Sequence, residues 1–286
     1  MARTTNETSP LLGHENRDRD SPSHSHSARP LERLRTHLKT ELNPQHADLL
    51  LLLCYTITGL LDSSAVFIWG SFVSMQTGNT VYLGLGVSGL DESGRSQRWL
   101  KSLISIASFC IGSFFFALLH HSRWFFGSPR QRGALVFSFV LQMACVAGAA
   151  TIVTLEEQSK SDPLTWKIAV PLSLVAFQSS GQAVTSRVVG YSSLTSVVLT
   201  SIYCDLFSYP ALALTTTSSG GGGRGKKADE WRRLGAVLAL FAGILAGGLW
   251  AKSEVGLKGA LWTAVLLKGG IAGAWMVWRG EERDVV

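Results

Sequence analysis

An aspartate and a cluster of amide and hydroxyl side chains interrupt an apolar stretch between Gly59 and Gly89. Asp62 is flanked by leucine, valine, phenylalanine and tryptophan, so its carboxylate must face a partner, a water-filled cavity or a bundle interior rather than lipid. Residues 76–80 (Gln-Thr-Gly-Asn-Thr) follow, and Gly78 allows the backbone to leave helical geometry. A carboxylate at such depth can take up and release protons. The polar run predicts a helix break that lines a cavity.

Polar residues also recur in the second half of the chain. Gln178 and Gln182 lie on one face of a predicted helix, which suits either a solute path or hydrogen bonds between helices. A second polar stretch, 191–196, predicts a second break, and an acid and a base lie near it. The candidate binding residues for a solute or ion are Asp62, Gln76, Thr77, Gly78, Asn79, Thr80, Gln178, Gln182, Arg187, Thr195 and Asp205.

The charged candidates also have a purely structural interpretation. Asp62 or Asp205 could pair with Arg187 as a bridge between helices. Lys268 could be a further cation within the membrane, although lysines near helix ends usually extend their ammonium group to the membrane surface. The sequence leaves these alternatives open.

The composition indicates a polytopic membrane protein. The chain has 286 residues, of which 46% are hydrophobic and only 16% are charged, whereas soluble proteins carry about a quarter charged residues. We expect an all-α transmembrane bundle over residues 49–280, since a span needs about 20 apolar residues. Six windows qualify: 49–69, 100–119, 134–155, 168–189, 234–251 and 260–278. Residues 77–90 and 194–214 are ambiguous, so the expected number lies between six, with two broken or half helices, and eight.

The amino-terminal region has a different composition. Residues 1–30 are polar and are predicted to be a disordered tail, and residues 31–42 are predicted to form a basic amphipathic helix at the membrane surface. In the tail, Glu7, Leu11 and Leu12 resemble an acidic dileucine sorting signal, which cytosolic adaptors recognise. This pattern favours an endomembrane of vacuolar type, with the plasma membrane as the alternative.

The distribution of basic residues predicts the orientation. Lysine and arginine are concentrated on the side of the tails in both the six-span and the eight-span arrangement, which places both termini in the cytosol. The net charge of +6 is explained by this topology, so we expect the lipid bilayer rather than nucleic acid as a partner. A Ser/Gly-rich stretch, 215–230, is predicted to be a flexible cytosolic linker.

An internal repeat relates residues 49–155 to residues 168–278. Arg98 precedes Gly112 by fourteen residues, as Arg233 precedes Gly247, and each pair is followed by Gly-Ala-Leu at 133–135 and at 259–261. Upstream, Asp62 aligns with Gln178. Halves of three spans each would be inverted, an arrangement in which carriers bind substrate at broken helices near the midplane, whereas halves of four spans would be parallel.

Several of these residues resemble a known family. The stretch Gly-Leu-Leu-Asp at 59–62, Phe-Val at 72–73, Thr-Gly-Asn-Thr at 77–80, Phe-Gln at 177–178 and Thr195 are similar to the YoaK family, also catalogued as domain of unknown function 1275. The resemblance covers about residues 46–280. It departs at Thr195-Ser196, where a Thr-Gly pair is expected. The resemblance implies a multi-pass membrane protein without an assigned activity.

Two function classes remain from the sequence. The first is a carrier or channel-like protein for a small solute or ion. The second is a non-transporting scaffold or assembly protein whose polar residues hold helices together. The four cysteines have no metal-ligand spacing, and we find no nucleophile, phosphate-binding or nucleotide motif, so we expect neither a cofactor nor an enzyme.

Overall fold

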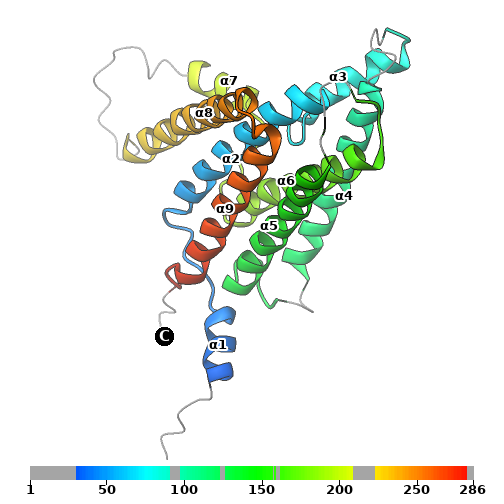
Figure 1. Ribbon diagram of the computed structural model, residues 1–286. Helices are drawn as coiled ribbons and strands as arrows, with labels where there is room; N and C mark the ends of the chain where they lie inside the picture. The colour runs from blue at the N-terminus through cyan, green and yellow to red at the C-terminus, as the bar shows by residue number, and fades with distance from the viewer. Residues whose placement is uncertain are drawn as a thin grey trace, which may run out of the picture.

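The computed structural model describes residues 30–90, 97–122, 126–156, 158, 162–208 and 223–281, and within these ranges the chain is helical (Figure 1). The tail with Glu7, Leu11 and Leu12 lies outside the described residues. The helices are α1 (Pro30–Lys39), α2 (Ala47–Trp69), α3 (Gln76–Val87), α4 (Arg98–His121), α5 (Arg132–Leu155), α6 (Trp166–Val188), α7 (Thr200–Ser208), α8 (Gly223–Lys252) and α9 (Gly256–Val277).

Several helices are long and apolar enough to cross a membrane. Among the described residues, five helices meet both conditions: α2, α4, α5, α9 and the part of α8 from Ala228 to Lys252. The helix α6 has 23 residues, but it contains Pro171 and a run of buried polar side chains, which lower its hydropathy. The structure therefore confirms an all-helical chain of membrane-protein character within the described residues.

Some predicted boundaries differ from those of the structure. The surface helix α1 ends at Lys39 instead of residue 42, because Glu41 and Leu42 form isolated bridges with Gln131 and Gly280. The predicted linker 215–230 is too long, since α8 already begins at Gly223.

The first helix break lies just before the polar run that was predicted to form it. Residues 70–75, here called the first break, join α2 to α3, and Gly70 ends α2 with a φ of 75°, a left-handed conformation that favours glycine. Gln76 begins α3, so residues 76–80 form the first turn of a helix, and the prediction that they are the break is wrong by a few residues. Residues 189–199, the second break, join α6 to α7, and there Gly190 has a φ of 89°.

Glycines bring two pairs of helices into close contact. The helix α2 packs mainly against α8, and α4 packs mainly against α6. A β-carbon at Gly243 of α8 would overlap the carbonyl oxygen of Thr56 in α2, and one at Gly112 of α4 would overlap that of Phe177 in α6. Small residues that allow backbones to approach in this way are typical of helix packing in membranes.

The two ends of the bundle have different partners. At one end, here called the tail end, the backbone amide of Leu42 donates to the carbonyl of Arg130, and that of Asn43 donates to the carbonyl of Arg279. The start of α2, the α4–α5 connection and the end of α9 therefore meet there. In Figure 1, α1 and the end of α9 lie near each other at this end. At the opposite, distal end, Trp69 donates its indole N–H to Gln158, so the end of α2 meets the α5–α6 connection.

Candidate functional site

Asp62 holds the first break in place. Its Oδ1 accepts the backbone amides of Val73 at 2.8 Å and Ser74 at 2.9 Å, and its Oδ2 accepts the Ser74 hydroxyl in a short hydrogen bond. The carboxylate is 2% exposed. Backbone amides freed from a helix need acceptors at membrane depth, so this carboxylate supplies what the break lacks.

Two residues of the polar run also bind the break. Asn79 is fully buried, and its amide reaches back to accept the Phe72 amide at 2.9 Å and to donate to the Phe72 carbonyl at 2.8 Å. Gln76 donates to the carbonyl of Val73 at 3.2 Å. From other helices, Ser105 donates to the Phe72 carbonyl and Ser179 to that of Val73. The polar groups of the first break are therefore largely satisfied by protein.

The second break is held by α2 and α6. Tyr55 of α2 donates its hydroxyl to the carbonyl of Thr195 at 3.1 Å. Gln182 of α6 donates its amide to the Ser196 hydroxyl at 3.2 Å and to the carbonyl of Cys54 in α2 at 3.1 Å. Both breaks therefore contact the same two helices.

A lysine lies at the centre of this polar network. The ammonium of Lys268, in the middle of α9, donates to the amide oxygens of Gln142 in α5 at 2.7 Å and Gln182 in α6 at 2.9 Å. Lys268 is fully buried, so the expectation that its side chain extends to the membrane surface is wrong. We call Lys268, Gln142 and Gln182 the lysine cluster.

Sequence reasoning did not include Gln142 or Lys268 in the candidate site. A signal was present, because Gln142 follows Gly133 by nine residues and Lys268 follows Gly259 by nine, so the two occupy equivalent positions in the proposed repeat. Applying the repeat beyond Gly-Ala-Leu would have brought them together.

Four of the candidates lie away from this interior. Thr77 and Thr80 are exposed, and the Thr80 hydroxyl bonds only within its own helix, to Gln76. Arg187 is also exposed, with its guanidinium donating to the carbonyl of Ala183. Asp205 forms its ion pair in the described structure with Arg233 at 3.4 Å, not with Arg187.

Two further candidates, Gln178 and Gly78, are packed against other parts of the protein. Gln178 is fully buried and donates its amide to the carbonyl of Val175, while its own amide oxygen has no hydrogen-bond partner among the described residues. Gly78 lies against the ring of Phe72. No group of three or more His, Cys, Asp or Glu within the described ranges is arranged to hold a metal ion.

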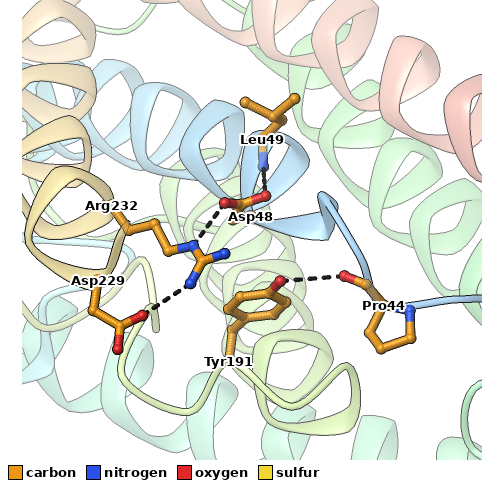
Figure 2. Close-up of polar contacts among 6 residues, drawn as sticks. All are labelled: Pro44, Asp48, Leu49, Tyr191, Asp229 and Arg232. Atoms are coloured by element: carbon orange, nitrogen blue, oxygen red, sulfur yellow. Dashed lines mark hydrogen bonds and ion pairs between the residues drawn. The ribbon is translucent and has the colours of Figure 1, made fainter. Parts of the chain in front are cut away.

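A polar cluster, here called the arginine clasp, joins three segments at the tail end (Figure 2). Arg232 of α8 donates from Nε to Asp48 of α2 at 2.7 Å and from Nη1 to Asp229 at 2.8 Å. Its guanidinium lies 5.3 Å from the ring centre of Tyr191, whose hydroxyl donates to the carbonyl of Pro44 at 3.3 Å. Burial, reinforced by the negative charge of Asp48, raises the pKa of Tyr191, so its hydroxyl remains a donor at neutral pH.

A cavity of about 340 Å³ opens at the distal end. Its lining comes from the ends of α2 and α5, from Gln158, and from the α8–α9 connection with the first turn of α9, where Glu254 and Lys258 contribute charged groups. The cavity lies near the start of α9, whereas Lys268 lies in the middle of that helix.

The long apolar helices, the buried polar interior and the short helices beside two breaks define a multi-pass helical membrane protein. Within this class, the family model described as "Protein of unknown function (DUF1275)" matches residues 50–274, and the chain belongs to that family. The YoaK name is consistent with it. No curated protein and no solved structure matches the chain.

Proposed function

We propose that the protein is a membrane carrier for a small solute or ion, with its site between two inverted halves. The observation that carries the proposal is the pair of helix breaks. Each half contains one, each break contacts both α2 and α6, and a buried polar network lies between them. Broken helices at the interface of inverted repeats are where carriers bind their substrates.

The packing of the helices supports the repeat. If α2–α5 and α6–α9 are the two halves, the α2–α8 contact is equivalent to the α6–α4 contact, and α5 packs on its own equivalent, α9. Individual residues agree: a β-carbon at Gly247 would meet Ser64 of α2, and one at Gly112 would meet the equivalent Ser180 of α6. Lys268 and Gln142, also equivalent, contact each other across the α5–α9 interface.

The short helices have matching contacts in the two halves. Arg98, at the start of α4, lies over the ring of Tyr82 in α3, 3.4 Å from its centre. Arg233, near the start of the apolar part of α8, pairs with Asp205 in α7. These contacts support the equivalence of α3 and α7.

We further propose that α3 and α7 do not cross the membrane, which gives six crossings. The residues before α2 and the α4–α5 connection bond to each other, and only two crossings between them, by α2 and α4, are compatible with that contact. Three long helices in each half make the halves inverted. With the distribution of basic residues, the tail end is then cytosolic.

Flux into proteoliposomes tests the carrier proposal. Solid-supported membrane electrophysiology would be recorded for sodium, potassium, chloride and acetate gradients and for pH steps. We expect a solute-dependent current from the wild type and its loss in Gln182→Leu, because this change removes the amide that joins the second break to α2. Thr80→Val is the control, since it changes an exposed hydroxyl, and it should keep the current. No current from correctly folded wild-type protein with any of these solutes would contradict the proposal.

The competing function is a scaffold or assembly protein, and one observation favours it. The oxygens of Asp62 are occupied by the first break, as expected of a structural residue. In that case Gln182→Leu would reduce the amount of folded protein and no solute would produce a current.

The location of the protein is a separate proposal. We propose that a cytosolic adaptor binds Glu7, Leu11 and Leu12 and directs the protein to a vacuolar-type endomembrane. A fluorescent fusion carrying Leu11→Ala and Leu12→Ala should then move to another membrane, such as the plasma membrane. An unchanged distribution would exclude this role.

A further inference from the structure

The lysine cluster has the contacts of a charged ammonium. An ammonium has three N–H donors and no acceptor, and Lys268 directs its Nζ at the amide oxygens of Gln142 and Gln182. Its Nζ also lies 5.5 Å from the ring centre of Phe139, within the range of a cation–π contact. Two carbonyl oxygens and an aromatic ring all favour the positive form.

A positive charge on Lys268 has no negative partner among the described residues. No carboxylate in that part of the chain lies within ion-pair distance of Lys268. Asp62, the buried acid of α2, instead uses its oxygens on Val73 and Ser74. A buried charge is costly in a membrane interior unless an opposite charge or a set of hydrogen bonds compensates it.

The fold itself does not require a charge at this position. The repeat-equivalent residue of Lys268 is the neutral Gln142, and two amides could bond to each other across the α5–α9 interface. A neutral amide at position 268 would therefore also form the contact with Gln142, and the packing of α5 on α9 does not need the lysine. Such a departure from the repeat is expected where a ligand binds.

We propose that the lysine cluster binds a small monovalent anion, inorganic or carboxylate, at the interface of the two halves. The ammonium supplies the charge and its remaining N–H donor, and the amide oxygens of Gln142 and Gln182 hold it in position. Each of the three side chains is at most 2% exposed, so a ligand reaches the cluster only when the helices around it move apart. The proposal deepens the carrier function and rests on it for the location of the site.

Equilibrium binding to detergent-purified protein tests the proposal without any flux. The probes are [³⁶Cl]chloride and [¹⁴C]acetate, measured by scintillation proximity at constant ionic strength in sodium gluconate, whose anion is much larger than either probe. We expect saturable binding of at least one probe by the wild type, near one anion per chain. Lys268→Gln should weaken it at least tenfold, because this variant copies the neutral residue of the other half.

A charge swap provides the matched rescue. The double variant Lys268→Gln with Gln142→Lys returns the ammonium to the same interface from the opposite helix, so it should recover part of the binding. Lys252→Gln, at the end of α8, removes an equal charge elsewhere and should bind as the wild type does. Lys268→Met is the second neutral variant if Lys268→Gln does not fold.

The outcomes are separable. Absence of saturable binding by the wild type, or equal binding by wild type and a folded neutral variant, would overturn the anion site. If neither Lys268→Gln nor Lys268→Met folds, the presence or absence of saturable anion binding by the wild type decides whether the proposal stands. Loss of anion binding with solute-dependent currents intact would leave the carrier function standing, and anion binding without any current would leave only the site.

Discussion

At the scale of single residues, Asp62 of α2 and Lys268 of α9 are two buried ionisable side chains, and their surroundings differ. Asp62 receives two backbone amides and a hydroxyl, all from the first break. Lys268 receives only neutral amide oxygens and a ring. The aspartate therefore stabilises the backbone of the first break, whereas the lysine is the group on which the proposed anion site depends.

Two substitutions of Asp62 should differ in their effect on stability. Asp62→Ala removes every acceptor from the amides of Val73 and Ser74, so we expect a loss of about 3 kcal/mol in the free energy of unfolding. Asp62→Asn keeps one oxygen for those amides and lets Ser74 turn its hydroxyl to accept, so we expect a loss of about 1 kcal/mol. Thermal unfolding in detergent measures both. Equal losses would mean that the charge, and not the hydrogen bonding, holds the break.

Adjacent arginines in α8 provide a second comparison. Arg232 donates two hydrogen bonds to a largely buried Asp48 and to Asp229, whereas Arg233 makes a longer contact with the half-exposed Asp205. We expect Arg232→Gln to lower the free energy of unfolding by about 1 to 2 kcal/mol and Arg233→Gln by less than about 0.5 kcal/mol. Denaturation of the purified variants at low and moderate salt would measure both losses. A larger effect at Arg233 would contradict the role assigned to the arginine clasp.

At the scale of helices, the sequence predicted the elements better than their ends. The six apolar windows correspond to the six long helices. The length of an apolar run that can span a membrane is set by the bilayer, so such a run can be recognised without knowledge of tertiary contacts. The breaks depend on single glycines with left-handed backbone, at Gly70 and Gly190, and the sequence contains 29 glycines, so composition does not show which ones end a helix.

The candidate site was predicted only in part, because the sequence shows which residues are close along the chain and not which helices pack together. Residues bonded within a segment, such as Asp62 and Asn79 with the first break, lie close in sequence and can be recognised as a polar cluster. The lysine cluster joins α5, α6 and α9, which are far apart along the chain. Only packing, or the repeat carried through in register, brings Gln142 to Lys268.

Two glycines of α8 test the close packing of that helix on α2. Gly243→Ala would place a methyl group on the carbonyl of Thr56, so we expect a loss of about 1 to 3 kcal/mol. Gly248→Ala, five residues further on, enters open space and should be neutral or stabilise by about 0.5 kcal/mol through helix propensity. Thermal unfolding in detergent should show a lower stability for Gly243→Ala and an unchanged or slightly higher stability for Gly248→Ala. A destabilising Gly248→Ala equal to Gly243→Ala would exclude close packing as the cause.

At the scale of the whole molecule, the proposed carrier function requires two inverted halves, in which α5 would meet α9 while α2 and α6 support both breaks. In the proposed arrangement the distal end and the tail end would be equivalent by the repeat, and alternating access would open each in turn to the same interior. The distal cavity would then lie at one of these two proposed entrances.

The side of the membrane reached by single cysteines tests this arrangement most directly. Cysteines would replace Ser88, Thr165 and Ser253, each exposed, in a chain whose four natural cysteines are replaced, with Arg35→Cys as the reference for the tail side. Intact and permeabilised vesicles would be labelled with an impermeant maleimide. The account predicts that positions 88, 165 and 253 all label from the side opposite to position 35. Labelling of positions 88 and 165 from the side of position 35, with position 253 opposite, would mean eight crossings in parallel halves and would contradict it.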